Sequence, residues 1–500
     1  MKNKKFNLTS EIEKIIKKFN LSDSWNKNVI KDIKKFENNK FNKKSFKRKN
    51  LKKLCFITID GEDAKDFDDA VYCERLDKNW KLFVSIADVS HYIEDSSHID
   101  KEAKSRGTSV YFPNYVIPML PEILSNNLCS LRQGEDKYTI TAEMIIDSTG
   151  KIKSYKFYNS IINSYARLTY NQIDIFLKNK KIIKNKNIIK NIDNLYSLYK
   201  VLKKSREKRN AVEFETQEFS FIVGKNNEIK GIKNNKRLES QKIIEECMIA
   251  ANVSSSLFIK KNKFNSLYRV HDEPSLEKIE ESAITLKNLG YKLNGAKIPS
   301  TLEINTILNA SKKKLDHHLV SNIILRAMSR AEYTPKNIGH YGLSLKSYNH
   351  FTSPIRRYPD LIVHRIIKSI IEKNKSTYNF EKLEQIGKNS SENERNAESA
   401  ERELQSILLC NYAKNFIGKK FTAYINSIVN FGLFISIKEE PIQGLVHISS
   451  LGQEYFVYNE KKNILVGDKS KKVYKVGDII KVKLISAYPL EKKIDFVLIK

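Results

Sequence analysis

The sequence has few cysteines and no long apolar run, and both absences narrow the class of protein. No stretch of about eighteen consecutive apolar residues occurs, so we expect no membrane span. The basic residues 1–6 are not followed by an apolar segment, so we expect no secretory signal. The five cysteines lie far apart and form no CxxC pair, which argues against a zinc knuckle or a disulfide framework. They fit a reducing compartment, and we expect a cytoplasmic protein.

Acidic residues are scarce relative to basic ones. The chain has 58 Asp and Glu against 89 Lys and Arg, which gives a formal net charge of +31. Each phosphate that is neutralised by Lys or Arg releases a counterion, so a polyanionic partner is the natural inference. The alternative is that part of the lysine content reflects a biased coding composition, because Asn and Ile are also abundant. The charge therefore favours nucleic-acid binding without establishing it.

The chain of 500 residues is too long for one core, and its pattern divides it into three parts. Residues 1–50 have the pattern of a basic, helical and solvent-facing lead-in. Residues 51–416 form the large middle part. Residues 417–500 contain short alternating strands separated by glycine and charged turns, which is typical of a small barrel of about five strands.

The middle part begins with strands and continues with helices. Apolar runs after Leu54 predict strands, and the residues 77–79 predict a hairpin turn between two of them. Helices are predicted over 178–194, 239–259, 319–332 and 392–416. The first of these is rich in Lys, Asn and Ile and is interpreted as a charged surface helix.

The most informative segment is TIDGEDAKDFDDA (58–70). A strand delivers Asp60, a loop containing a glycine follows, and then Asp66, Asp68 and Asp69 come close together. Carboxylates this dense repel one another unless a cation lies among them, and hard oxygen ligands suit Mg²⁺, with Mn²⁺ as a second possibility. Two such ions about 4 Å apart can activate a water and stabilise the leaving oxygen of a phosphodiester. The alternative is an acidic surface loop; an EF-hand fits poorly because the spacing does not match the calcium loop.

A second segment, HFTSPIRRYPDL (350–361), places two adjacent arginines after a proline. Pro354 stiffens the backbone before Arg356 and Arg357. The planar guanidinium binds phosphate oxygens with two donors and can stabilise charge that develops during phosphoryl transfer. The alternative is that these arginines pair with Asp360 or another carboxylate for structure. We expect the neighbouring histidines to be structural, because Mg²⁺ prefers oxygen ligands.

Together these segments resemble the catalytic domain of the RNase II/RNase R family, and the RNase R branch is the more similar one. The motifs that carry the resemblance are TIDGEDAKDFDDA (58–70), IADVSHY (86–92), IPMLPEILSNNLCSL (117–131), IEECMIAAN (244–252), HYGL (340–343) and HFTSPIRRYPDL (350–361). The resemblance implies an α+β fold, in which a mixed α/β RNB catalytic domain over 51–416 precedes a five-stranded OB-fold β-barrel over 417–500.

The resemblance also implies roles for individual residues. Asp60, Asp66, Asp68 and Asp69 match the metal-site aspartates of the family. Asp68 and Arg356 match the residues that carry the chemistry. The residues that match RNA-binding positions are Tyr111, Tyr170, Phe214 and Glu401; Arg357 is a further RNA-binding candidate because of its phosphate-binding side chain. Without the motifs, core packing would be the default expectation for the aromatic residues, and a solvated side chain would be the default for Glu401.

The C-terminal part resembles an S1-type OB-fold that binds RNA. Its pattern includes NFGLFI (430–435), GLVHIS (444–449) and VGDIIKVKL (476–484). Phe431, Phe434 and His447 match the positions at which such a domain presents stacking groups. The alternative for each of them is a place in the barrel core.

The resemblance implies processive 3′→5′ hydrolysis of single-stranded RNA to nucleoside 5′-monophosphates by a two-metal mechanism. We expect a monomer whose cofactor is Mg²⁺. We expect it to use no nucleotide cofactor and to bind no membrane. Only about fifty residues precede Asp60, so the cold-shock domains of a typical RNase R are expected to be absent and RNA binding to be weaker. The alternatives are a non-catalytic RNA-binding protein on the same scaffold and a DNA nuclease. A retired site would be expected to have lost an aspartate or Arg356, and all of them are present.

Overall fold

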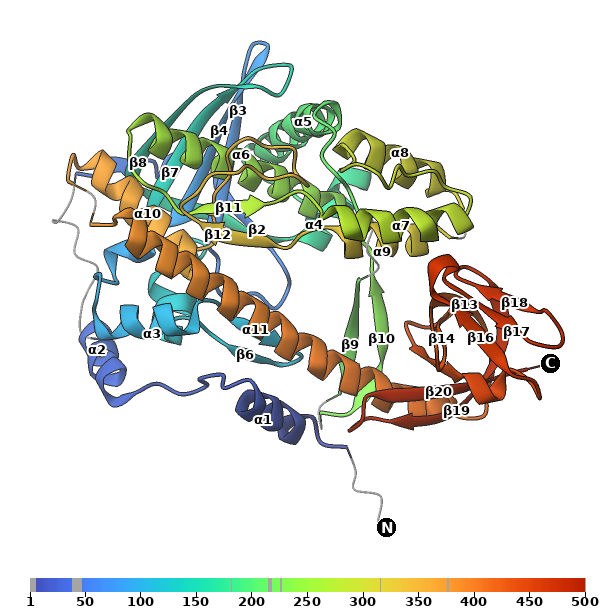
Figure 1. The fold of residues 1–500 in the computed structure, drawn as a ribbon. Coiled ribbons are helices and arrows are strands. Elements are labelled where there is room, and N and C mark those ends of the chain that lie inside the picture. Colours follow the sequence, from blue (N-terminus) through green and yellow to red (C-terminus); the bar gives the residue numbers. More distant parts are fainter. Residues whose placement is uncertain are drawn as a thin grey trace.

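The larger part of the chain is built around a six-stranded sheet (Figure 1). The computed structural model describes residues 6–37, 47–180, 182–214, 218–224, 227–314, 316–375 and 377–499. The strands in sheet order are β1 (Lys49–Asn50), β8 (Ile152–Thr169), β2 (Phe56–Asp60), β3 (Asp69–Leu76), β4 (Asn79–Ala87) and β7 (Asp136–Ile146). The first half of β8 pairs with β7 and the second half with β2, so the sheet curls back on itself.

The predicted hairpin is confirmed, with its turn one residue shorter than expected. β3 pairs with β4 from Asp69↔Ile86 to Leu76↔Asn79, and the turn consists of Asp77 and Lys78. Asp77 has a positive φ of 46°, a conformation that Asp tolerates better than most residues.

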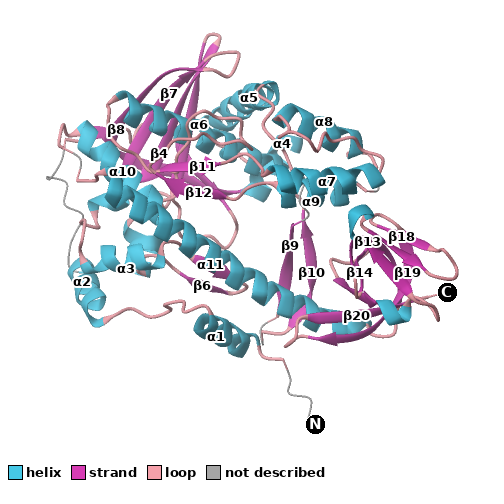
Figure 2. Ribbon diagram, viewed as in Figure 1, coloured by secondary structure: helices cyan, strands magenta, loops and turns pink. Residues whose placement is uncertain are grey.

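Three helices cover the sheet, namely α5 (Lys186–Lys208), α6 (Glu239–Lys261) and α10 (Tyr358–Ile371) (Figure 2). The helix predicted over 178–194 is wrong: α4 (Tyr170–Asn179) ends within it, and α5 begins within it. Asn185 ends the continuity because its side chain accepts the amides of Asn187 and Ile188 and caps α5. Nor is the whole stretch exposed, as a surface helix would be. Asn191 is buried and donates to the carbonyls of Cys55 and Val71.

The helix predicted over 239–259 is present as α6, whereas the two helices predicted after it depart from their predicted bounds. α7 (Leu276–Asn288), α8 (Thr301–Ser311) and α9 (His317–Ala327) pack around a satellite core of their own. The helix predicted over 319–332 is too long, because α9 ends at Ala327 and β12 (Ala331–Thr334) then pairs with β11 (Tyr268–His271). The helix predicted from 392 begins earlier, as α11 (Phe380–Ala413), where the side chain of Asn379 caps its first turn.

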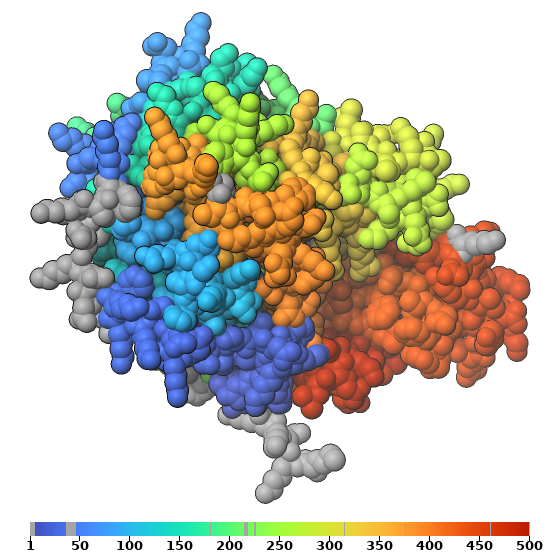
Figure 3. All heavy atoms as spheres, turned by 60° about the vertical axis from the view of Figure 1, so that its left-hand side comes forward, coloured from blue at the N-terminus to red at the C-terminus, as the bar shows by residue number. Residues whose placement is uncertain are grey.

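The N-terminal lead-in is packed against the rest of the protein and is not solvent-facing as predicted, and its first helix contacts α11. It forms α1 (Leu8–Lys18) and α2 (Lys27–Glu37), whereas residues 1–5 and 38–46 lie outside the described residues. Leu8, Ile12 and Ile15 share a buried cluster with apolar residues of α11, which accounts for their helical spacing. Figure 3 shows this blue segment lying against the orange helix, beside the red C-terminal part.

Shorter elements complete the larger part. They are α3 (His98–Arg106), the hairpin of β5 (Val110–Phe112) and β6 (Tyr115–Ile117), and the hairpin of β9 (Glu218–Val223) and β10 (Ile229–Asn235).

The C-terminal part is a closed five-stranded barrel, as predicted. Its strands are β13 (Lys420–Val429), β14 (Gly432–Ile437), β15 (Gln443–His447), β20 (Lys493–Leu498) and β19 (Ile479–Tyr488). A small sheet of β16 (Phe456–Asn459), β17 (Ile464–Gly467) and β18 (Val473–Lys475) is inserted between β15 and β19. Gly432 is required at the start of β14, because a Cβ there would lie 2.3 Å from the carbonyl oxygen of Val446.

A buried ion-pair cluster ties the sheet to α10. The carboxylate of Asp88, in the IADVSHY motif, lies 2.7 Å from Arg48 and 2.9 Å from Lys368 of α10. Burial alone would raise the pKa of Asp88, but the two cations hold it well below its usual range. Because this pKa is depressed on folding, the pairs contribute stability above the unfolded pKa of about 3.9, and that stability is lost as pH falls below it.

We therefore expect Asp88→Asn to lower the free energy of unfolding by about 3–5 kcal/mol at pH 7, because the ion pairs of this buried carboxylate with Arg48 and Lys368 are lost. The loss should shrink as pH falls below about 4, because Asp88 of the unfolded parent protonates there while the folded carboxylate stays ionised. Urea unfolding of the parent and variant at pH 7 and pH 3 measures this. Asp63→Asn, at an exposed position, is the control. Equal stabilities of the Asp88 variant and the parent at pH 7 would show that the cluster is not stabilising.

Candidate active site

Four aspartates from one loop line a single pocket. Asp60 ends β2 and Asp69 begins β3, so the loop between these paired strands carries Asp66 and Asp68. All four side chains line a pocket of about 430 Å³ together with Arg356. The two segments singled out in the sequence therefore meet at one place.

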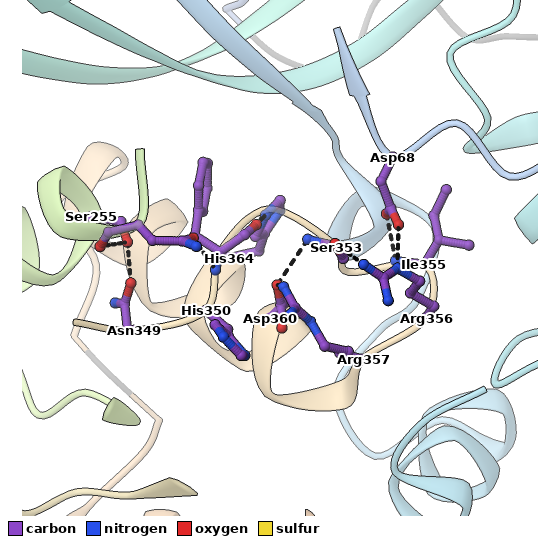
Figure 4. A network of polar contacts seen from close by, with 12 residues as sticks. Asp68, Ser255, Asn349, His350, Ser353, Ile355, Arg356, Arg357, Asp360 and His364 are labelled. Carbon is purple, nitrogen blue, oxygen red and sulfur yellow. Dashed lines mark hydrogen bonds and ion pairs between the residues drawn. The ribbon is translucent and has the colours of Figure 1, made fainter. Parts of the chain in front are cut away.

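The arginine segment itself positions Asp68. The carboxylate of Asp68 is buried, and its Oδ1 accepts the backbone N–H of Ile355 at 2.9 Å. Its Oδ2 lies 3.8 Å from Nε of Arg356 (Figure 4). The loop and the arginine segment are far apart in the chain, and the Asp68 carboxylate joins them. Asp68 is one of the two residues that the sequence resemblance assigns to the chemistry.

Two further side chains hold the rest of the loop. The Ser130 hydroxyl accepts the N–H of Phe67 at 3.0 Å and donates to the carbonyl of Lys65 at 2.7 Å. The guanidinium of Arg167 donates to the carbonyls of Gly61 at 2.8 Å and Glu62 at 2.5 Å. Sequence reasoning singled out neither Ser130, although it lies inside the motif over 117–131, nor Arg167.

The electrostatics of the pocket reflect crowded negative charge. Burial, followed by repulsion from Asp66, raises the pKa of Asp60 to about 6. Burial also raises the pKa of Asp68 and of Asp69 well above the usual range, while the positive charge of Arg356 opposes the shift at both. Such shifts are expected of carboxylates that are gathered with too little positive charge nearby.

The donor chemistry fits a hard divalent cation such as Mg²⁺ or Mn²⁺. Oδ2 of Asp60 is buried without a hydrogen-bond partner, which is costly for a carboxylate oxygen unless a cation binds it. Among the described residues, no three Asp, Glu, His or Cys side chains are grouped to hold one ion by themselves. Mg²⁺ does not need such a cage, because it usually keeps several waters and combines one or two carboxylates with substrate phosphates.

The two adjacent arginines have different surroundings. Arg356 is 44% exposed, lines the pocket and donates to the Ser353 hydroxyl at 3.2 Å. The Arg357 side chain is only 17% exposed and donates to Asp360 at 2.7 Å, so the structural pairing considered from the sequence is present for Arg357 (Figure 4). Burial would lower the pKa of Arg357, but the Asp360 carboxylate raises it above its ordinary value. Arg357 also lines the pocket, and its contact with RNA stays a prediction.

Two of the predicted aromatic residues line the same pocket. Tyr111 of β5 is 42% exposed, and its hydroxyl donates to Asp66 at 3.4 Å. Tyr170 is the first residue of α4. Burial raises the pKa of both phenols, so they remain protonated donors. Glu401 of α11 does not line the pocket; it accepts the backbone N–H of Tyr111 at 2.7 Å and so holds β5.

Phe214 is not brought to this pocket. It is half-buried and packs, with Val212, against the core of α7, α8 and α9. Its predicted contact with RNA stays a prediction.

The histidines of the arginine segment make structural contacts, as expected. A ring nitrogen of His364 bonds the carbonyl of Phe351 at 2.7 Å, and His350 bonds the Tyr333 hydroxyl at 2.8 Å. Burial lowers the pKa of both imidazoles, and neither ring lines the pocket.

One wall of the pocket was not identified from the sequence residue by residue. It is contributed by α6 and by the segment that precedes Pro354, namely Ile244, Glu245, Met248, Ile249, Asn252, Tyr348, Thr352 and Ser353. Asn252 joins the two parts of this wall, since it accepts the N–H of Phe351 at 2.9 Å and donates to the Tyr348 hydroxyl at 3.0 Å. The available signal was the IEECMIAAN motif, which covers the α6 half.

The barrel presents its aromatic residues on the outside. Phe431 is 46% exposed and Phe434 is 39% exposed, and their rings meet edge to face with centroids 6.1 Å apart. His447 is exposed and pairs in register with Gly432. A place in the barrel core, the alternative considered for each, does not apply to these three.

Comparison with known proteins agrees with this geometry. The model of the RNB domain matches residues 48–373. The chain belongs to the RNase II/RNase R family. The model of the S1 RNA binding domain matches residues 414–496, which include the barrel.

The chain is similar to ribonucleases R. It is 41% identical to Ribonuclease R of Escherichia coli over 466 residues, which cover 90% of this chain and 57% of that protein. The chain therefore spans little more than half the length of that relative.

Solved structures share the fold. The structure of Mycoplasma genitalium RNase R in complex with ribose methylated single-stranded RNA matches with a TM-score of 0.94 and 30% identity, over 99% of this chain and 78% of that one. The structure of yeast Ssd1, a pseudonuclease, matches with a TM-score of 0.72 and 20% identity, over 91% and 58% of the two chains. The fold by itself therefore does not decide between a nuclease and a protein that has lost catalysis.

The Arg167 contacts lead to a testable prediction. We expect Arg167→Gln to raise the Mg²⁺ concentration for half-maximal binding about 10-fold, because residues that orient ligating groups typically contribute this much. Arg167→Lys should recover part of the affinity, since it keeps the charge near Asp60 but loses the two-carbonyl contact. Calorimetric titration of metal into each variant measures this without any turnover assay. An unchanged metal affinity in Arg167→Gln would show that the clamp does not position the loop.

Proposed function

We propose that this chain is a hydrolytic exoribonuclease that removes nucleotides processively from the 3′ end of single-stranded RNA and releases nucleoside 5′-monophosphates. The observation that carries the proposal is the shared pocket of Asp60, Asp66, Asp68 and Asp69 with the exposed guanidinium of Arg356. The similarity to proteins named Ribonuclease R supports it, as does the structure of a relative in complex with single-stranded RNA.

In this proposal the four aspartates hold two divalent ions, Mg²⁺ or Mn²⁺. The chemistry that such ions supply when bound is activation of water and stabilisation of the leaving oxygen. Arg356 faces the scissile phosphate and stabilises the charge that develops on its oxygens. Tyr111 and Tyr170 hold the terminal nucleotides in the pocket, and Tyr111 keeps its place because Glu401 accepts its backbone N–H.

The barrel has a separate part in the proposal. Its exposed rings Phe431 and Phe434, with His447 beside them, stack on bases of the incoming strand. Stacking accepts every base and contributes about 1–3 kcal/mol per base, which suits an enzyme that reads no sequence. We further propose a division at 416/417 between the catalytic part and the barrel, with the chain acting as a monomer.

The decisive experiment compares a linear single-stranded RNA, labelled at its 5′ end, with a circular RNA and a linear DNA of the same sequence. With Mg²⁺, we expect one short labelled product from the linear RNA, free nucleoside 5′-monophosphates, and intact circular RNA and DNA. Cleavage of the circle would indicate an endonuclease. Binding of the linear RNA without cleavage, in Mg²⁺ and in Mn²⁺, would favour a non-catalytic RNA-binding protein.

A further inference from the structure

The outer face of the barrel carries lysines that oppose one another. Lys420 of β13 is the register partner of Lys483 of β19, and Thr422 is the partner of Lys481. The three lysines are exposed. Like charges that lie directly opposite on a sheet destabilise it, so fold stability does not account for this arrangement.

A fourth lysine, Lys438, joins them. The backbone N–H of Lys438 donates to the carbonyl of Thr422 at 3.1 Å, which places Lys438 at the other edge of β13. On the far side, the partner of Lys483 on β20 is Val497. Within the described part of the chain, none of the four ammonium groups forms an ion pair with a carboxylate. We call Lys420, Lys438, Lys481 and Lys483 the lysine row.

The lysine row continues the face that carries the exposed aromatic rings. On β14, Phe434 and Ser436 point to the same side, because side chains two apart share a face. Ser436 is the register partner of Tyr424, and Tyr424 is in turn the partner of Ile479 on β19. From Phe434 to Lys438 the distance along the strand is about 13 Å, at about 3.3 Å per residue.

We propose that the lysine row is a second RNA contact of the barrel, which binds the phosphates of a strand whose neighbouring bases stack on Phe431 and Phe434. This inference rests on the proposed function, because it assumes that the barrel binds RNA. The sheet face fits a phosphate backbone, since it offers several uncompensated cations in a row and no carboxylate partner for them. Binding of phosphates would also relieve the repulsion between Lys420 and Lys483.

The test compares two triple variants of the full-length chain that lower the net charge equally. The first is Lys420→Gln, Lys481→Gln and Lys483→Gln. The control is Lys184→Gln, Lys186→Gln and Lys190→Gln, at exposed positions around the start of α5. Binding of a fluorescent single-stranded RNA is measured by anisotropy without divalent metal, over a range of KCl concentrations. The control separates loss of the general positive field from loss of local contacts.

We expect the first variant to bind RNA at least 10-fold more weakly than the control. Its slope of log affinity against log salt should fall by about 2, since each single-strand phosphate contact contributes about 0.7. Its unfolding temperature should not fall, because a repulsion is removed. If the triple variant does not fold, Lys483→Gln and Lys190→Gln provide the same comparison, with an expected slope difference of about 0.7.

A third variant, Phe434→Ala, separates the two levels of the inference. If Phe434→Ala weakens RNA binding but the lysine variant matches its control, the lysine row is not an RNA contact and the proposed role of the barrel stands. If the lysine variant matches its control and Phe434→Ala binds RNA as tightly as the parent, this face of the barrel does not bind RNA and the proposed role of the barrel is wrong.

Discussion

Asp68→Asn is expected to slow RNA hydrolysis by about 100- to 1000-fold while leaving the fold and RNA binding intact, because it removes one preorganised charge from the reacting centre. The asparagine oxygen can still accept the N–H of Ile355, so the link between the loop and the arginine segment is kept. Shortening of a 5′-labelled RNA to its end product measures the rate, and anisotropy measures binding.

The metal-free stability of the same variant gives a second readout. Burial raises the pKa of Asp68 in the folded state, so the folded protein binds more protons than the unfolded chain above the unfolded pKa of about 3.9. The parent therefore loses stability as pH rises above that value, and Asp68→Asn should remove part of this loss. Asp63→Asn, from the exposed side of the same loop, is the matched control and should change neither activity nor stability. Normal turnover in the Asp68 variant would disprove the assigned site.

The second large effect distinguishes the adjacent arginines Arg356 and Arg357. Arg356→Ala should lower kcat about 100- to 1000-fold with an unchanged unfolding temperature, because this partly exposed guanidinium faces the pocket. Arg356→Lys should recover little, since an ammonium cannot reproduce the planar two-donor contact with phosphate. Steady-state kinetics on a short RNA and thermal unfolding measure the two effects.

Arg357→Ala should behave in the opposite way. It leaves the Asp360 carboxylate, which is fully buried, without its cationic partner, and a broken buried ion pair costs about 3–5 kcal/mol. The free energy of unfolding from urea titration should fall by that amount. A stable Arg357→Ala variant with lost turnover, together with an unstable Arg356→Ala variant, would reverse the two assignments.

The sequence alone determined the parts whose signals are local. The hairpin of β3 and β4 and the five-strand pattern of the barrel follow from residue spacing, which depends only on backbone periodicity. The dense carboxylates of the 60–69 loop predicted a cation-binding site for the same reason, because four negative charges in so short a segment repel one another whatever surrounds them.

Local signals failed where a side chain caps a helix and where strands that are distant in the sequence pair. The Lys- and Asn-rich stretch over 178–194 has helical composition, but the Asn185 side chain caps a new helix there and divides it. α9 ends at Ala327 because the residues that follow pair as β12 with β11, a contact made between distant parts of the chain. Helical periodicity contains neither piece of information.

Only the tertiary structure decided how the site is assembled. The sequence could not show that the N–H of Ile355 binds Asp68, or that Arg167 and Ser130 hold the loop. Nor could it show that Arg357 pairs with Asp360 while Arg356 faces the pocket. These contacts join residues that are mostly far apart along the chain, and adjacent identical side chains differ only in what surrounds them. Their roles therefore follow from burial and from partners, which exist only after the chain has folded.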